Sequence, residues 1–228
     1  MKTVSGKKSI SENKPILAIE TSGEICGACV YFDDYKFAEI NLRLKHLHAE
    51  KVIDITEEVL KQVHLELSGI RAIAVSSGPG SFTGLRIGMS AVKGIALGAG
   101  LPIIPVPTFE ALAYQAANYL PEGTEFTIAN KVNLEEIYHA EFRKAGDRYE
   151  VTKPISVLKN EEFRASGDGL VFGNFIPEGI KLVSNLIPWP SSSSVARWAY
   201  KFGKDLLTYD YDFLEPIYLK NFVIKEHK

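Results

Sequence analysis

"SSGPGSFTGLRIGMSAVKG", residues 76–94, holds five of the chain's 18 glycines and only two charged side chains. Residues 69–77, which overlap the start of this stretch, are rich in β-branched and small residues and predict a buried strand. The apolar run after it, residues 101–106, predicts a second strand. A glycine turn and a helix over residues 85–97 join them, and a helical crossover of this kind makes two strands parallel neighbours in one sheet.

Upstream of this unit lie three β-like runs separated by short polar turns, over residues 15–22, 25–32 and 36–44. Connections that short predict antiparallel neighbours, so the chain opens as a meander. Apolar residues then recur on one helical stripe within residues 46–67. A further helix is expected over residues 108–120, with Thr108 as its N-cap. The predicted order is βββαβαβα, a mixed sheet with helices on its faces, as in a ribonuclease H-like domain.

The second half of the chain is less regular. Strands are expected within residues 125–132, 135–151 and 168–173, the second of them bending at "AGD". A helix within residues 191–207 begins at serines that can cap it. Its apolar positions fall on one face: Val195, Trp198, Ala199, Phe202 and Leu206. We therefore predict a flexible tail (1–13), a first ribonuclease H-like domain (14–110) and a divergent second domain (111–228) whose C-terminal segment packs back on the first.

Composition and charge are those of an ordinary globular protein, with 46% hydrophobic and 24% charged residues. The formal net charge of −2 gives no basic excess, so any contact with RNA is expected to go through a partner. No apolar run suits a membrane span or an export signal, and the chain is expected in the cytoplasm. Cys26 and Cys29 alternate to opposite faces of a strand, which predicts core filling rather than a metal or redox site.

The glycine-rich turn matches neither common phosphate-binding pattern. A P-loop needs GxxxxGK[ST] and a dinucleotide fold needs GxGxxG, whereas Gly78, Gly80 and Gly84 give GxGxxxG. A weaker anion site at the start of the helix remains an alternative, because backbone N–H groups point outward there. Its candidate residues are Thr21, Ser22, Gly78, Gly80, Ser81, Thr83 and Arg86. The other interpretation is a tight turn that only starts a buried helix.

The helix over residues 85–97 is apolar or small on every side except one narrow polar sector. Such a helix needs cover almost all round. The sheet and the preceding helix cover part of it, and the small residues Gly88, Ala91 and Gly94 let a further backbone approach closely. That backbone belongs either to the second domain or to another subunit, and the pattern alone leaves both open.

Four stretches carry a resemblance to a known family. They are "ILAIETS" (16–22), "SSGPGSFTGLRIGMSAVKGIALG" (76–98), "PIIPVPTFEALA" (102–113) and "PIYLKN" (216–221). Together they resemble TsaB, and "GPGSFTGLR" is a specific signal for that family. The resemblance covers residues 15–120 well and the rest of the chain thinly.

The resemblance implies an α/β fold of two ribonuclease H-like halves, as in the actin, Hsp70 and hexokinase (ASKHA) superfamily, with mixed sheets flanked by helices. It also implies that this chain is no enzyme and has no catalytic residues of its own. TsaB is the non-catalytic partner of TsaD, which transfers threonylcarbamoyl to the adenosine beside the anticodon of tRNA. The ATPase TsaE joins that complex, where ATP or ADP binding is an open expectation. No cofactor is expected on this chain alone.

The implied contact with TsaD, or with a second copy in a homodimer, uses the two helices of the first half. The residues expected there are Ile55, Val59, Leu85, Gly88, Met89, Ala91, Val92, Gly94 and Ile95. No membrane contact is expected, and tRNA is reached indirectly. The pattern departs from the family at residues 131–133, where Lys-Val-Asn stands in place of the usual Asp-Ala-Arg, so the polar role of that stretch does not carry over.

Other chemistry is weighed against this interpretation. A small ASKHA-type ATPase or phosphotransferase acting alone is the alternative function, with Glu20 as a strand-end carboxylate that either faces an ion or caps a turn. A hydrolase would rest on the serines at 191–194, but no nucleophile elbow surrounds them. His46, His48 and Glu50 lack the spacing of a metal pair, so no metal site is predicted.

Overall fold

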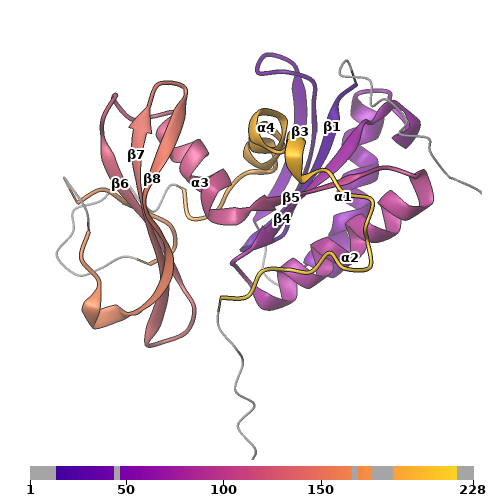
Figure 1. Cartoon of the computed structure of the whole chain (residues 1–228). Coiled ribbons are helices and arrows are strands. Elements are labelled where there is room, and N and C mark those ends of the chain that lie inside the picture. Colours follow the sequence, from indigo (N-terminus) through magenta and orange to yellow (C-terminus); the bar gives the residue numbers. More distant parts are fainter. Residues whose placement is uncertain (1–13, 44–46, 166–168, 176–186, 220–228) are drawn as a thin grey trace, which may run out of the picture.

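The structure is a computed structural model that describes residues 14–43, 47–165, 169–175 and 187–219. Within those residues the chain forms two mixed sheets, with helices between and beside them (Figure 1). The predicted α/β class, with mixed sheets and flanking helices, is confirmed. The predicted flexible tail, residues 1–13, lies outside the described residues.

The first sheet has the strand order β3-β2-β1-β4-β5. Its strands are β1 (Ile16–Glu20), β2 (Ile25–Tyr31), β3 (Phe37–Arg43), β4 (Ala72–Gly78) and β5 (Ile103–Pro107). The first three strands pair antiparallel through short turns, whereas β4 and β5 run parallel to β1 because helices cross between them. This topology is ribonuclease H-like and confirms the predicted βββαβαβα order.

Helices cover both faces of the first sheet. On one face lie α1 (His48–Gln62) and α2 (Phe82–Ala99), above Leu17 and Ile19 of β1. On the other lies α4 (Ser192–Phe202), which packs against Ile16 and Ala18 although it comes from the far end of the chain (Figure 1). Because helices cover both faces of the sheet, β1 is buried along its whole length and is apolar from Ile16 to Ile19.

The two cysteines follow the same alternation along β2. Cys26 belongs to the core under α1 and α2, and Cys29 to the core under α4, so the prediction that they point to opposite faces is confirmed. Burial raises the pKa of both thiols, that of Cys26 to about 11. Both are therefore protonated at neutral pH and act as small apolar side chains.

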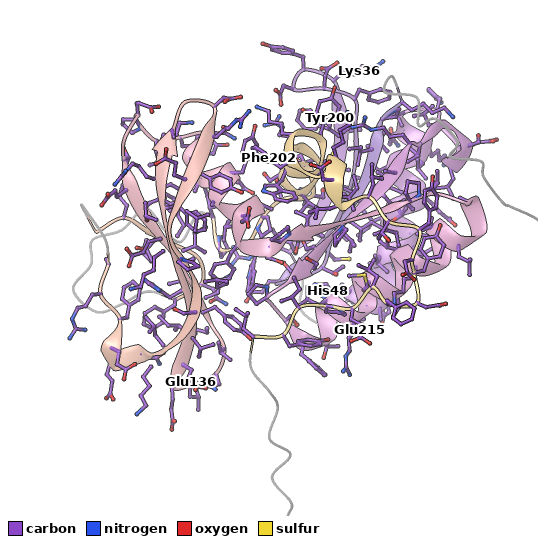
Figure 2. All side chains as sticks on the ribbon, viewed as in Figure 1. Lys36, His48, Glu136, Tyr200, Phe202 and Glu215 are labelled. Atoms are coloured by element: carbon purple, nitrogen blue, oxygen red, sulfur yellow. The ribbon has the colours of Figure 1, made fainter. Side chains whose placement is uncertain are left out.

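Two helix ends differ from the prediction. The helix expected within 46–67 ends at Gln62, and His64 then takes a left-handed backbone conformation with φ 54°. The last helix ends at Phe202, so Leu206 lies beyond it and is exposed instead of joining the predicted apolar face. Phe202 itself packs against Tyr149 of the second sheet, with ring centroids 6.2 Å apart (Figure 2).

The second sheet repeats the first in shorter form, with the order β8-β7-β6-β9. Its strands are β6 (Glu125–Lys131), β7 (Glu136–Ala145), β8 (Arg148–Lys159) and β9 (Val171–Phe172). The single bent strand expected within residues 135–151 is wrong, because the chain reverses at "AGD" and β7 and β8 pair antiparallel as a hairpin. Between the two sheets lies α3 (Thr108–Ala117), which gives Phe109 and Leu112 to the second core and Ala111 and Tyr114 to the α4 side of the first.

A segment that we name the C-terminal strap, residues 208–219, runs back across the first half of the chain along α2 (Figure 1; Glu215 is labelled in Figure 2). Thr208 forms a β-bridge with Ile103, and Tyr211 Oη donates to the Leu101 carbonyl at 2.6 Å. Tyr211 also packs, with Leu214, against the core under α1 and α2. The strap thus adds a layer of this chain's own side chains beside α2.

Candidate functional site

The glycine loop between β4 and α2, residues 78–81, packs directly on the turn that follows β1. Gly80 comes so close to the Ser22 carbonyl that a β-carbon on residue 80 would overlap it. Gly78 has a positive φ of 110°, and a β-carbon there would lie 2.6 Å from the Ile217 carbonyl of the strap. The glycines therefore allow three backbone segments to approach one another closely.

Several polar groups of this loop are bonded within the chain. Ser81 N donates to Ser22 O at 2.7 Å, and the Ser81 hydroxyl caps α2 by accepting from Gly84 N at 3.2 Å. Gly78 N donates to Thr108 Oγ1 at 3.1 Å. Thr108 therefore holds the loop, and its predicted role as the side-chain cap of α3 is wrong.

This internal bonding favours the other interpretation of the sequence, a tight turn that starts a buried helix, and the anion site stays a prediction. The structure brings all seven candidate residues together, but it uses five of them to build a bonded turn: Thr21, Ser22, Gly78, Gly80 and Ser81. Thr83 and Arg86 keep exposed side chains. The Arg86 guanidinium lies 3.8 Å from the centre of the Phe82 ring, and its Nε donates to Tyr218 Oη of the strap at 3.1 Å.

Glu20, at the end of β1, is completely buried, with 0% of its surface exposed. Its carboxylate accepts from Ser22 N and Ser22 Oγ at 2.5 Å each, and from Ser76 Oγ of β4. Burial outweighs these hydrogen bonds and raises the pKa of Glu20 to about 7. Of the two roles left open by the sequence, the geometry favours the turn cap, because the carboxylate ties β1 to its own turn and to β4.

The side of α2 that faces the first sheet is covered by this chain. We name this side, which includes Leu85, Gly88, Met89 and Val92, the inner side of α2. Six of the nine residues predicted to contact a partner are buried within it: Ile55, Val59, Leu85, Gly88, Met89 and Val92. Gly88 faces Thr21 so closely that a β-carbon on residue 88 would overlap Thr21 Oγ1. Of the two sources of cover that the pattern left open, the chain itself covers this side, through the sheet, α1, the turn after β1 and the strap.

The outer side of α2 is different. We use this name for Ala91, Gly94, Ile95, Leu97 and Gly98. Gly94 and Gly98 have no atom within 4 Å of the position of a β-carbon, and Leu97 is 69% exposed. Ala91 and Ile95 are half-buried and pack in part against the chain's own core. The partner contact predicted for residues 91, 94 and 95 stays a prediction, and the small side chains leave room for it.

A groove of about 550 Å³ opens where α1 and α2 both begin. Its walls come from the turn after β1 and the first turns of the two helices: Gly23, Glu24, His48, Ala49, Ser81, Thr83, Gly84 and Ile87. His48 Nε2 lies 3.1 Å from the Ile25 carbonyl, so β2 orients the ring (Figure 2). Sequence reasoning placed His48 at a helix start but missed the groove, because the groove depends on two distant helix starts lying side by side.

The remaining sequence candidates hold local structure. Ser191 caps α4 by accepting from Ser194 N at 3.2 Å, and the Glu39 carboxylate accepts from Ser193 N at 3.0 Å. Within the described residues, no group of three His, Cys, Asp or Glu side chains gathers as metal ligands, and His46 lies outside them. Among the helices that the structure describes, none combines the length and apolarity needed to cross a bilayer.

The stretch that departs from the family pattern forms the end of β6 and the turn to β7. Lys131 N donates to Asn174 Oδ1 at 2.7 Å. Asn133 Oδ1 accepts from Glu135 N at 2.8 Å and from Glu136 N at 2.9 Å. Asn133 therefore stabilises the turn, as a side chain of this type commonly does.

Comparison with known protein families shows which family this two-sheet chain belongs to. The model of a family described as "TsaD: tRNA N6-adenosine threonylcarbamoyltransferase" matches residues 43–163, more than half of the chain. The matched part includes α1, the glycine loop, α2, α3 and most of the second sheet. The chain therefore belongs to this family of two-sheet proteins.

Similarity to individual proteins narrows the class. The "tRNA threonylcarbamoyladenosine biosynthesis protein TsaB" of Escherichia coli K12 is 28% identical over 90% of this chain and 94% of that protein. The TsaB protein of Haemophilus influenzae is 33% identical over 57% of this chain, and the match spans only 54% of that relative. A "tRNA N6-adenosine threonylcarbamoyltransferase" of Halalkalibacterium halodurans is 31% identical over 92% of this chain and 61% of that protein. Within the larger family, the chain belongs to TsaB.

Solved structures show the same fold. The structure titled "YeaZ from Pseudomonas aeruginosa" has a TM-score of 0.74 and 22% identity, covering 90% of this chain and all of that one. A second Pseudomonas aeruginosa structure, described as similar to the peptidase YEAZ, has a TM-score of 0.76 at the same identity. The expected fold of two ribonuclease H-like halves is therefore confirmed.

Proposed function

We propose that this chain is a non-catalytic subunit that binds and stabilises a TsaD-type transferase in the synthesis of threonylcarbamoyladenosine in tRNA. Membership of the TsaB family supports the pathway. The main support for binding to the TsaD-type protein is the outer side of α2. Small residues and an exposed leucine form a narrow apolar surface there. A partner helix can approach such a surface closely and bury it.

Likeness between the two proposed partners supports this pairing. The transferase of Halalkalibacterium halodurans aligns over 92% of this chain and 61% of its own length, so most of this chain has a counterpart in the transferase. Related chains can pair as identical subunits do, with the same helices of each facing one another about a near two-fold axis. A second copy of this chain would use the same surface, so a homodimer is the expected form of the isolated protein.

Two features support a role without catalysis of its own. Glu20, the candidate strand-end carboxylate, is sealed from solvent and engaged by serine donors. Two backbone donors of the glycine loop are taken up within the chain, Ser81 N by the turn after β1 and Gly78 N by Thr108. An ATPase or phosphotransferase acting alone would need such groups open toward a nucleotide. Contacts with TsaE and, indirectly, with tRNA, and a cytoplasmic location, belong to the same proposal.

A charged substitution on the outer side of α2 tests the proposal. We expect Gly94→Arg to abolish co-purification with the TsaD-type protein of the same organism, because a buried unpaired guanidinium would oppose the contact. The variant should fold normally, since residue 94 is exposed, its β-carbon meets no atom, and arginine favours helices more than glycine does. The readout is the amount of partner retained by the tagged chain after co-expression.

A matched control keeps the added charge and changes its place. Thr152→Arg puts the same side chain on exposed β8 of the second sheet, and we expect it to retain the partner. Retention by a folded Gly94→Arg chain would contradict the proposal. So would transfer of threonylcarbamoyl to tRNA by the purified chain alone, which is expected to show none.

A further inference from the structure

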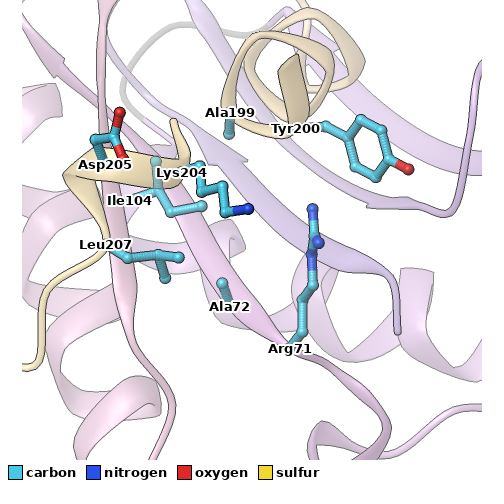
Figure 3. Close-up of a pocket in the computed structure, with 8 residues that line it drawn as sticks. All are labelled: Arg71, Ala72, Ile104, Ala199, Tyr200, Lys204, Asp205 and Leu207. Atoms are coloured by element: carbon cyan, nitrogen blue, oxygen red, sulfur yellow. The ribbon is translucent and has the colours of Figure 1, made fainter. Parts of the chain in front are cut away.

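A second cavity lies on the opposite side of the first sheet from α1 and α2. Its volume is about 460 Å³, which suits a small molecule. It opens between α4, the start of β4, β5 and the 3₁₀ turn Lys204–Leu206 (Figure 3). Its lining residues are Arg71, Ala72, Ile104, Ala199, Tyr200, Lys204, Asp205 and Leu207. None of them belongs to the glycine loop or to the outer side of α2.

Two cationic side chains meet in this cavity. Arg71 precedes β4 and Lys204 follows α4, and Figure 3 shows their charged ends directed into the same space. The carboxylate of Asp205 points away from the gap between them. Within the described residues, Arg71 forms no ion pair, and its guanidinium carbon lies 4.9 Å from the centre of the Tyr200 ring. Like charges converging from distant segments raise the local positive potential, which favours an anion.

The floor of the cavity is apolar. Four segments line it together: Ala72 of β4, Ile104 of β5, Ala199 of α4 and Leu207 just after the 3₁₀ turn. A free inorganic anion gains nothing from such a floor, whereas an organic anion with an apolar body buries surface there. The Tyr200 ring holds the planar Arg71 guanidinium on its face, which leaves the guanidinium edge available for the paired hydrogen bonds that oxyanions accept.

We propose that this cavity binds a small phosphomonoester with an apolar or aromatic body. The phosphoryl dianion lies between Arg71 and Lys204, whose two charges it matches, and the body lies on the apolar floor. The site is independent of the proposed partner contact, because it lies on the other face of the sheet and shares no residue with it.

Calorimetric titration of the full chain with phenyl phosphate tests this site. We expect saturable binding, tighter than binding of inorganic phosphate, which has the head group alone, and of benzoate, which carries one charge. Arg71→Gln and Lys204→Gln should each weaken phenyl phosphate binding about tenfold, the usual effect of losing a charge-assisted hydrogen bond. Methyl signals of Ile104 and Leu207 should shift on titration in nuclear magnetic resonance spectra.

Lys201→Gln is the matched control, because Lys201 lies on α4 close to Lys204 in sequence but lines a different cavity and pairs with Asp147 at 3.4 Å. It should leave phenyl phosphate affinity unchanged. Lys204 is exposed, so its substitution tests the site even if Arg71→Gln fails to fold. Absence of binding at millimolar phenyl phosphate, or unchanged affinity in a folded Lys204→Gln chain, would overturn the proposal. Equal affinity for phenyl phosphate and inorganic phosphate would overturn the role of the floor.

Discussion

Gly88 and Gly94 lie less than two turns apart on α2, and they have opposite surroundings. Gly88 presses against Thr21 of this chain, whereas a β-carbon on Gly94 would meet no atom at all. In the sequence the two positions look the same, because each is a glycine within an apolar stretch of the helix. An apolar helix with small residues therefore predicts that another segment packs closely against it. The pattern does not show whether that segment belongs to the same chain or to another subunit.

The largest effect is expected at the end of β1, at Glu20. Its folded-state pKa of about 7 lies above its ordinary value of 4.5, so the folded chain binds the proton more tightly than the unfolded chain. Stability contributed by this group is therefore present below pH 4.5 and lost as the pH rises toward 7. The whole difference corresponds to about 3 kcal/mol. Glu20→Gln, which carries no proton equilibrium, should lack this loss.

Urea denaturation of both proteins at pH 4.5 and pH 8 measures the effect. The free energy of unfolding of the Gln variant, relative to that of the native chain, should be higher at pH 8 than at pH 4.5 by about 3 kcal/mol. Other titrating groups contribute equally to both proteins and cancel. A difference that does not change with pH would show that the Glu20 carboxyl group is not sealed from solvent.

Gly88→Ala tests how tightly the inner side of α2 is packed. The added methyl group overlaps Thr21 Oγ1, and overpacking of this kind lowers the free energy of unfolding by about 1 to 3 kcal/mol. That loss should exceed the helix-forming gain of alanine over glycine, roughly 1 kcal/mol. In a Thr21→Ala background the overlapping atom is gone, and the same substitution should become neutral or stabilising. A double-mutant cycle in urea detects this coupling.

Gly94→Ala is the counterpart on the outer side and the smallest effect. Residue 94 is exposed and its β-carbon position is open, so alanine should raise the free energy of unfolding by about 0.5 to 1 kcal/mol. Thermal unfolding beside the Gly88→Ala chain gives the comparison directly. A loss of stability at residue 94 would mean that the isolated protein already covers this side.

Local pattern predicted most of the first sheet. Short polar turns between the first three runs give the antiparallel meander, and the glycine turn with its helix gives the parallel pair β4 and β5. These features depend on residues close together in the sequence, so period and turn chemistry are sufficient. The depth of Glu20 could not be predicted, because it depends on Ser76 arriving from a different strand.

The cover of α2 was harder to predict for the same reason. Residues 208–219 show no helical or strand period, and their place along α2 depends on single contacts such as Tyr211 with Leu101 and Ile217 with Ser77. The cavity between Arg71 and Lys204 likewise joins segments more than half the chain apart. Such sites follow from the path of the whole chain, and local pattern does not contain them.

The return of α4 to the first sheet has a consequence during translation. β5 ends at Pro107, but α4 begins only at Ser192. At roughly 5 to 20 residues per second, a ribosome needs on the order of ten seconds to make the chain between them. For that time the nascent first sheet presents Ile16, Ala18 and the rest of its α4 face to the surrounding medium, where a chaperone that binds apolar surfaces would find it.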